Sequence, residues 1–182
     1  MMLKPSDKWT WYYDDKASHL MLDLGDNMLF KTNLSNKLLV KCALDVNEFT
    51  VDDASSYQTF KEQISYLQLS EPRQAELALY CVAAKRFHKP VQPKSWFFDS
   101  CSIVGDEPQE GDIVQLSNSL NKGYFIVLES GEASSLCAYV DLEEFQLNPS
   151  KALVFGQAIK VMHDRMIVVN EQLTVQPVAL VS

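Results

Sequence analysis

The sequence predicts an α+β protein made of two domains. An N-terminal α/β domain, with antiparallel strands and two helices, is followed by a small β-barrel-like domain with an embedded short helix. The first part joins strand-favouring aromatic and aliphatic runs to two helical patterns. The second half has short strands separated by turns, at the spacing of about 8–12 residues that is typical of small barrels and sandwiches. We expect the domains to be residues 1–92 and 93–182.

Three short strands are predicted near the start of the chain. They are WTWYYD (9–14), HLMLDL (19–24) and MLFKT (28–32), and polar turn residues separate them. Strands joined by such short turns form an antiparallel meander. The next apolar run, NKLLV (36–40), can be a fourth strand or a turn of helix.

Two helices are expected next. In residues 51–67 the larger apolar side chains recur at offsets of three and four, which places them on one face. These side chains are Tyr57, Phe60, Ile64 and Leu67. Asp52 or Asp53 can cap the N-terminus of this helix, because a carboxylate accepts hydrogen bonds from the first backbone N–H groups. We prefer this interpretation of the acidic pair to a catalytic dyad.

The second helix has the pattern of a buried core helix. Ser70 can cap it, Pro72 falls in its first turn and Pro90 stops it. The helix is apolar nearly all round from residue 77 to residue 84, so we expect it to form the centre of the first domain.

The second half of the chain is expected to consist mainly of strands. The predicted strands are residues 95–101, 112–117, 123–130 and 135–141. In residues 155–166 the spacing of Ala158, Ile159 and Met162 instead predicts a short helix. RMIVV (165–169) and QLTVQPVALV (172–181) can supply the closing strands.

Composition restricts the kinds of partner. The 182 residues carry a formal net charge of -8, which argues against broad nucleic-acid binding because phosphate binding needs positive surface. Lys4, Pro5, Asp7 and Lys8 interrupt the start of the chain, so no secretory signal is expected. The longest apolar run, residues 77–84, is too short to span a bilayer. We therefore expect a cytoplasmic protein without a membrane partner.

The four cysteines are expected to be free, buried thiols. No CxxC pair occurs, and each cysteine has apolar neighbours. The cysteines are Cys42, Cys81, Cys101 and Cys137.

No catalytic or ligand-binding motif is present. The sequence lacks glycine-rich phosphate loops, the HExxH metal motif and the GxSxG nucleophile motif. His163 beside Asp164 is the only histidine next to a carboxylate, and the sequence offers no nucleophile for it. We therefore expect no enzymatic activity, no metal and no cofactor.

The aromatic run at the start of the chain has two possible roles. Strand alternation places Trp9, Trp11 and Tyr13 on one face and Tyr12 on the other. These rings can be core residues, which we favour, or they can form an exposed groove for a peptide or for stacked bases.

One stretch of this acidic chain is positively charged. No acidic residue occurs from Leu77 to Phe98, and we call this stretch the basic segment. It contains five basic residues, which are Lys85, Arg86, His88, Lys89 and Lys94. It can be a helix end that continues into an interdomain linker, or a docking surface for an acidic partner. Pro90 and Pro93 stiffen it toward an extended path, and aromatic residues follow at once.

Six short motifs occur in the order and spacing found in one protein family. They are MxxKPxDxWxWYYD at the start, MLDLxxxMLF (21–30), FxVDDA (49–54), KPxxPKSW (89–96), VxESGExxxLC (127–137) and AIKxMxDR (158–165). In these motifs the chain resembles ZapC, the Z-ring-associated protein C family of gamma-proteobacteria.

The resemblance implies a cytoplasmic, non-enzymatic cell-division factor. Members bind the tubulin-like GTPase FtsZ, promote lateral association of its protofilaments and stabilise the Z ring at midcell. The resemblance also implies an N-terminal α/β domain followed by a β-barrel-like domain with an embedded helix. Whether the protein is a monomer or a dimer stays open, as does the FtsZ surface that it binds. The alternative function is a single-stranded nucleic-acid-binding module that uses a small barrel and exposed aromatics.

The resemblance also suggests which residues bind FtsZ. The KPxxPKSW motif falls in the basic segment, so the role is assigned to Lys89, Pro90, Lys94 and Trp96. Leu22, from the MLDL motif, is a further candidate. Its alternation with Leu20 and Leu24 is typical of a core residue, whereas the resemblance favours a groove open to FtsZ.

Overall fold

The computed structural model describes residues 3–101 and 107–170. Contacts divide the chain into two compact units. The first unit holds residues up to Lys61 together with Ser70–Pro90, and the second holds Glu62–Leu69 together with residues from Val91 onward. The predicted α+β class is confirmed, since strands and helices are followed by a sheet-rich C-terminal part. The domain boundary after residue 92 stays a prediction.

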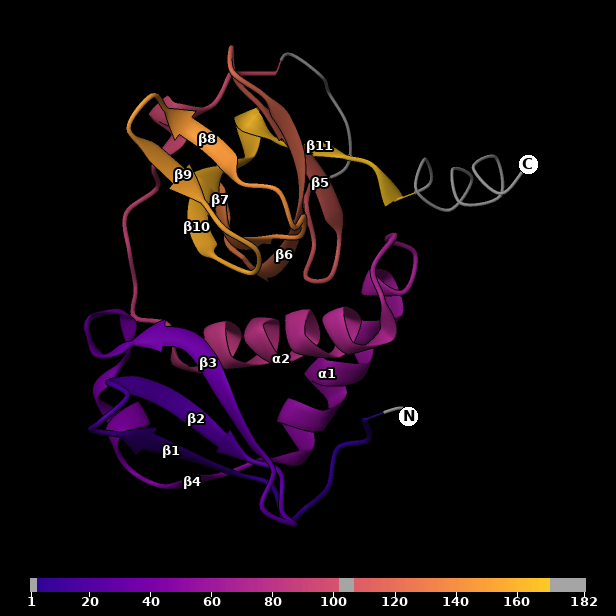
Figure 1. The fold of residues 1–182 in the computed structure, drawn as a ribbon. Coiled ribbons are helices and arrows are strands. Elements are labelled where there is room, and N and C mark those ends of the chain that lie inside the picture. Colours follow the sequence, from indigo (N-terminus) through magenta and orange to yellow (C-terminus); the bar gives the residue numbers. More distant parts are fainter. Residues whose placement is uncertain (1–2, 102–106, 171–182) are drawn as a thin grey trace. The chain divides into compact units, whose positions relative to one another are not determined.

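The first unit contains a four-stranded antiparallel sheet in the order β3-β2-β1-β4 (Figure 1). The strands are β1 (Thr10–Asp14), β2 (His19–Asp23), β3 (Leu29–Ser35) and β4 (Asn47–Glu48). The meander predicted from the first three runs is therefore confirmed. Residues Asn36–Leu38 form a 3-10 turn, η1, so the helical alternative for that run is right. The short strand β4 was not predicted.

Two helices complete the first part of the chain, α1 (Val51–Ile64) and α2 (Glu71–Phe87). Ser70 caps α2 as predicted, because its hydroxyl oxygen accepts a hydrogen bond from the backbone N–H of Arg73 at 3.4 Å. The predicted core helix is confirmed by eight buried side chains: Leu77, Ala78, Leu79, Cys81, Val82, Ala83, Ala84 and Phe87. The first helix ends three residues earlier than its pattern predicted.

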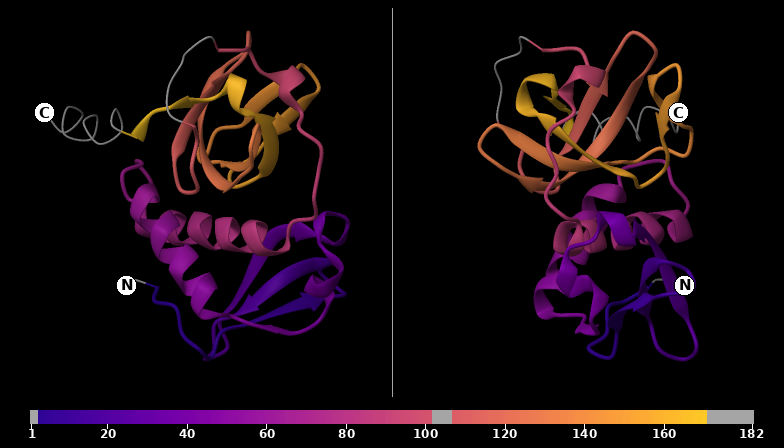
Figure 2. Two further views of the ribbon diagram at one scale, coloured as in Figure 1. Left: turned by 180° about the vertical axis from the view of Figure 1, so that it is seen from behind. Right: turned by 90° about the vertical axis from the view of Figure 1, so that its left-hand side faces the viewer.

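Trp11 is the centre of the first unit's core. Its ring meets the edge of Phe87 from α2, at 5.5 Å between centroids, and stacks on Phe49 at 5.7 Å. Both helices lie on one side of the sheet, which is the side that Trp11 faces (Figure 2). Trp9 and Trp11 are buried, so the core interpretation of these aromatics is confirmed and the exposed groove is wrong.

Leu22 is also a core residue. It pairs with Trp11 across β1 and β2, and directly paired residues of neighbouring strands face the same side of a sheet. No part of its surface is exposed. The expectation that Leu22 lines an open groove is therefore wrong, because its side chain lies on the face of the sheet that the helices cover.

The described part of the second unit is built from two antiparallel sheets. A five-stranded sheet has the order β10-β7-β6-β5-β11, and β8 pairs with β9 in a separate ladder. The strands curve around a single core in both views of Figure 2. Their bounds are β5 (Ile113–Ser117), β6 (Lys122–Ser130), β7 (Ser134–Tyr139), β8 (Phe145–Asn148), β9 (Lys151–Leu153), β10 (Ala158–Met162) and β11 (Ile167–Val168).

An aromatic cluster fills the core of the second unit. Phe98, Phe125, Tyr139 and Phe145 contact one another with centroid distances between 5.2 and 6.2 Å. Gly123 of β6 lies directly against two of these rings, where a larger residue would collide with them. The two sheets therefore share one interior.

Two of the predicted elements of the second unit are wrong. Residues Ser95–Phe97 form a 3-10 turn, η3, instead of a strand. Residues Ala158–Met162 form strand β10 instead of a helix, and only His163–Arg165 turn, as the 3-10 turn η4. Pairing with β7 fixes the extended conformation, with Ile159 and Val161 alternately buried. Strands β8 and β9 were not predicted.

The predicted closing strands have different outcomes. The RMIVV run contributes strand β11, while residues 172–181 lie outside the described residues. Among the described residues, no helix is both long enough and apolar enough to cross a membrane.

The cysteines are free, as expected, but they are not all buried. Cys81 and Cys137 are buried, whereas Cys42 is exposed and Cys101 is half-buried. Cys42 lies in a short 3-10 turn, η2 (Lys41–Leu44), in which only Ala43 packs inward.

Candidate partner-binding site

Trp96 is the most exposed aromatic side chain among the described residues, with 71% of its surface accessible. It lies in the turn η3 between buried neighbours, because Ser95 and Phe98 both point inward. Its ring packs only partly, against Phe97 at 5.5 Å between centroids. An exposed tryptophan on an ordered turn is a common anchor of protein interfaces.

Hydrogen bonds fix this turn to the edge of the five-stranded sheet. The backbone N–H of Lys94 donates to the carbonyl of Lys160 at 2.8 Å. The hydroxyl of Ser95 accepts from the backbone N–H of Met162, also at 2.8 Å. The turn is thus attached to β10, and Trp96 is held without being covered.

Arg165 adds a second attachment. Its Nε donates to the carbonyls of Ser95 and Phe98, at 3.2 and 3.1 Å, and its guanidinium pairs with Asp164. Sequence reasoning missed this role. The AIKxMxDR motif contains Arg165, but only the fold brings it to a turn about 70 positions earlier in the chain.

The other candidate residues are distributed between the two units. Lys89 and Pro90 are exposed at the end of the first unit, and Lys94 is exposed in the second. The ammonium groups of Lys89 and Lys94 make no hydrogen bond or ion pair within the described residues. Both charges are therefore available to a partner. The structure does not bring Leu22 to the surface with them.

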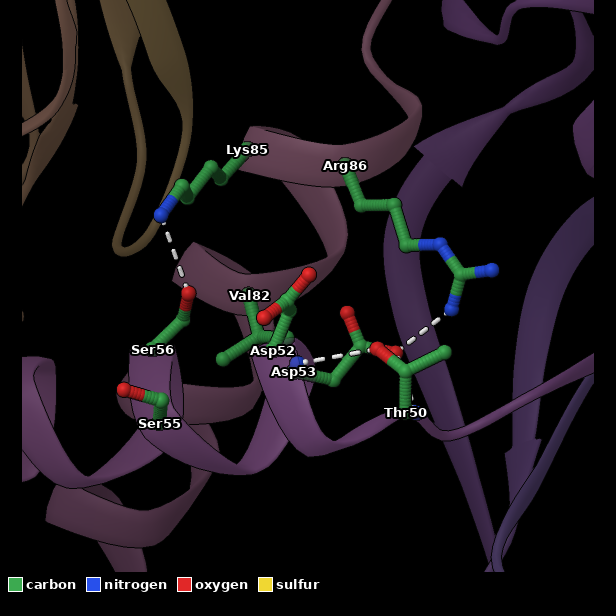
Figure 3. Close-up of a pocket in the computed structure, with 8 residues that line it drawn as sticks. All are labelled: Thr50, Asp52, Asp53, Ser55, Ser56, Val82, Lys85 and Arg86. Atoms are coloured by element: carbon green, nitrogen blue, oxygen red, sulfur yellow. Dashed lines mark hydrogen bonds and ion pairs between the residues drawn. The ribbon is translucent and has the colours of Figure 1, made fainter.

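Two cations of the basic segment are used inside the first unit. Lys85 donates to the hydroxyl of Ser56 at 3.0 Å, and Arg86 pairs with Asp53 and donates to the carbonyl of Glu48. Figure 3 shows both side chains reaching from α2 toward the first turns of α1. The basic segment therefore divides into structural cations at residues 85 and 86 and exposed cations at residues 89 and 94.

These side chains line an open hollow of about 480 Å³. It is lined by Thr50, Asp52, Asp53, Ser55, Ser56, Val82, Lys85 and Arg86. Two carboxylates and two cations share the hollow, and the ion pair between the buried Asp53 and the half-buried Arg86 already neutralises one charge of each sign. In this hollow the Asp53–Arg86 ion pair and the hydrogen bond from Lys85 to Ser56 join α1 to α2.

The helix cap in this hollow differs from the expected one. Thr50 caps α1, with its hydroxyl accepting from the N–H of Asp53 at 3.1 Å, while the Asp53 carboxylate accepts from the N–H of Thr50 at 3.0 Å. This reciprocal pair is a capping box. The expectation that an aspartate is the N-cap is wrong, because Asp53 occupies the third helical position and reaches back.

The fold supplies a hydroxyl beside the one histidine that has a carboxylate neighbour. Ser135 Oγ lies 2.8 Å from His163 Nε2, although the sequence offered no nucleophile. Ser135 is completely buried in β7, and the carboxylate of Asp164 pairs with Arg165. A substrate cannot reach this hydroxyl, so the pair serves to attach η4 to β7.

Comparison with known proteins identifies the family. The family model described as "Cell-division protein ZapC, N-terminal" matches residues 2–89, and the one described as "Cell-division protein ZapC, C-terminal" matches residues 90–172. The chain belongs to the ZapC family. The two ZapC models meet between Lys89 and Pro90, within the KPxxPKSW motif.

Relatives match over almost their whole length. A protein of Vibrio cholerae named "Cell division protein ZapC" is 65% identical over 181 residues, which is 100% of each chain. The protein of the same name from Vibrio vulnificus is 63% identical over 99% of each chain. A ZapC protein of Proteus mirabilis is 39% identical over 91% of this chain and 90% of its own. Membership in the ZapC family implies a role in cell division.

Proposed function

We propose that this protein is a cytoplasmic, non-enzymatic division factor that binds FtsZ. It promotes lateral bundling of FtsZ protofilaments and thereby stabilises the Z ring at midcell. Membership in the cell-division family ZapC supports the biological role. We propose that four exposed residues make the contact: Lys89, Pro90, Lys94 and Trp96.

The single observation that carries this proposal is the exposure of Trp96 on a fixed turn. Burying a free tryptophan ring against a partner removes a large apolar area from water, and little conformational freedom is lost when the turn is already ordered. Three hydrogen bonds provide that order: the N–H of Lys94 donates to the carbonyl of Lys160, and the turn accepts from the N–H of Met162 and from Nε of Arg165. Trp96 is therefore suited to be the anchor of a protein interface.

Local charge explains how an acidic protein can bind this partner. With a net charge of -8, long-range repulsion opposes the approach of another acidic protein. Exposed cations next to an apolar anchor reverse the field over a short range, because salt screens charges beyond about 10 Å. Lys94, which lies two residues before Trp96, provides such a cation.

The nucleic-acid alternative has weaker support. Its base-stacking surface was to come from the N-terminal aromatics, and Trp9 and Trp11 are buried in the core. Among the described residues Trp96 is the most exposed ring, and a single ring gives a strand few contacts.

Cosedimentation with FtsZ in the presence of GTP tests the proposal. We expect wild-type protein to increase both the pelleted FtsZ and the light scattering, without hydrolysing GTP itself. Trp96→Ala should weaken binding at least tenfold and leave the melting temperature unchanged, since the ring is mostly exposed. Phe98→Ala is the matched control, because that ring is buried and its loss should lower stability.

The opposite outcomes are equally distinct. Unchanged FtsZ scattering at saturating protein, or GTP turnover by this protein alone, would contradict the proposal. Retention on single-stranded DNA without cosedimentation would favour the alternative function. Comparing full-length FtsZ with a tail-deleted form then identifies which FtsZ surface is bound.

A further inference from the structure

Three lysines from distant parts of the sequence lie together in the first unit. Lys37 belongs to η1, Lys41 begins η2, and Lys89 follows the end of α2. We call these three residues the lysine patch. All three side chains are exposed, although the first two are far from the basic segment in the sequence.

Backbone pairing brings the two segments together. The N–H of Lys89 donates to the carbonyl of Leu38 at 2.8 Å, and the N–H of Val40 donates to the carbonyl of Phe87 at 2.9 Å. Leu39 and His88 form the bridge between these bonds. Lys37 and Lys41 therefore stand just before and just after one segment of a short antiparallel ladder, and Lys89 belongs to the segment that pairs with it.

The ammonium groups of the patch have no direct partner within the described residues. None of the three ammonium groups makes an ion pair or a hydrogen bond with residues 3–101 or 107–170. Like charges on neighbouring segments repel one another, and a partner of opposite charge removes this repulsion. The patch is thus a positive surface in a protein of net charge -8.

Exposed apolar side chains follow the patch in the sequence. Leu44 and Val46 are 45% and 73% exposed, and they lie three and five residues after Lys41. A partner that binds only through a polyphosphate backbone would gain nothing from contact with these aliphatic side chains. A protein segment that combines carboxylates with an apolar side chain can satisfy both features.

We infer that Lys37 and Lys41 form, with Lys89, a binding surface for an acidic protein segment that also carries an apolar residue. This inference rests on the proposed function, because Lys89 is one of the residues proposed to contact FtsZ. It adds two residues from outside the basic segment and specifies the chemistry of the partner. The contact is steered by charge, so it should weaken as the salt concentration rises.

Charge reversal at the two new positions tests the inference. We expect the double variant Lys37→Glu, Lys41→Glu to bind FtsZ polymers at least tenfold more weakly than wild type at low salt, with an unchanged melting temperature. The matched control is Lys8→Glu, Lys16→Glu, which reverses two exposed lysines of the same unit. Both variants have the same net charge, so general repulsion affects them equally.

A second probe separates this inference from the proposed function. A synthetic peptide of glutamates around one leucine should bind wild type and the control, and should lose at least tenfold affinity for the patch variant. If wild type binds FtsZ and both double variants bind it as tightly as wild type does, the lysine patch is refuted and the proposed function stands. If wild type does not bind FtsZ, but the peptide binds wild type and binds the patch variant at least tenfold more weakly, the proposed function fails and the patch stands.

A third outcome concerns the class of partner. Tighter binding of an oligonucleotide of the same length than of the acidic peptide, lost in the patch variant, would overturn the assignment to a protein segment.

Discussion

The indole Nε1 of Trp11 donates a hydrogen bond to Oδ2 of Asp53, at 3.1 Å, inside the first unit. The same carboxylate pairs with Arg86 and accepts from the backbone of Thr50. One buried aspartate therefore connects the first strand, the start of α1 and the end of α2. Its charge is tolerated because every one of these partners is a donor.

Replacing this aspartate should therefore lower the stability of the first unit. We expect Asp53→Ala to lower the free energy of unfolding by about 3–5 kcal/mol, since Arg86 and the Trp11 N–H lose their partner. Urea unfolding followed by circular dichroism measures the change. Asp52→Ala is the control, because that carboxylate is exposed and its loss should cost about 0.5 kcal/mol or less. Equal stability of the two variants would contradict the role of the network.

Leu22 should behave as a packing residue. Leu22→Ala removes a fully buried side chain opposite Trp11, so we expect a loss of roughly 2–5 kcal/mol in unfolding free energy. The folded fraction should bind FtsZ with unchanged affinity. Leu29→Ala, in the adjacent strand but 58% exposed, should leave the thermal melt nearly unaltered. Weaker binding by Leu22→Ala at full stability would show that the residue contacts the partner after all.

Lys89 and Lys94 should contribute to binding and not to stability. We expect Lys89→Glu, Lys94→Glu to slow association with FtsZ and to reduce its salt dependence, because charge steering is lost. Stability should change by no more than about 0.5 kcal/mol, since both side chains are exposed. Stopped-flow scattering at two salt concentrations gives the comparison. Lys16→Glu, Lys151→Glu is the control, with one exposed lysine in each unit, and a similar loss in that pair would remove the argument for a local site.

Gly123 should tolerate no side chain. A Cβ at this position would lie 2.9 Å from Cδ2 of Phe145 and 3.0 Å from Cε1 of Tyr139. Both rings are fixed within the aromatic cluster, so we expect Gly123→Ala to cost about 1–3 kcal/mol in a thermal melt. Adding Phe145→Leu should cost less than the sum of the two single changes, because the smaller side chain makes room. Strict additivity would mean that the collision is relieved in another way.

The four thiols should react in a fixed order. Cys42 is exposed and should be modified first by a thiol reagent, whereas burial and, secondarily, the charge of Asp164 raise the pKa of Cys101 and slow its reaction. Burial also raises the pKa of Cys81 and Cys137, so these two should react only after unfolding. Mass spectrometry of the native protein against time gives the order. Early labelling of Cys137 would contradict the packing of the second unit.

The sequence predicted those elements whose pattern fits a single structure. The second helix is apolar nearly all round and has a cap and a terminating proline, so no other element suits it. The run AIKVM is different, because Ile159 and Met162 have helical spacing while Ile159 and Val161 alternate. Only pairing with β7 decides in favour of a strand, and such pairing is not visible in a local pattern.

The candidate site was predictable in part for the same reason. The basic segment and its aromatic neighbours are contiguous, so a docking hypothesis could name Lys94 and Trp96. The exposure of Trp96 depends on hydrogen bonds to β10 and η4, and the approach of Lys37 to Lys89 depends on a ladder between distant segments. Contacts of this kind arise from tertiary structure alone.

The hydrogen bonds that attach Lys94 and Ser95 to β10 also affect how the chain folds during synthesis. During synthesis Trp11 of the first strand can be covered only after Phe87 has been made. The turn at Trp96 can be fixed only after Met162 has been made. Each unit therefore stays open until its last elements have left the ribosome, with apolar strands accessible to chaperones and proteases. Nascent chains arrested before Phe87 should accordingly be digested at once, whereas those that extend well beyond residue 90 should protect the first unit.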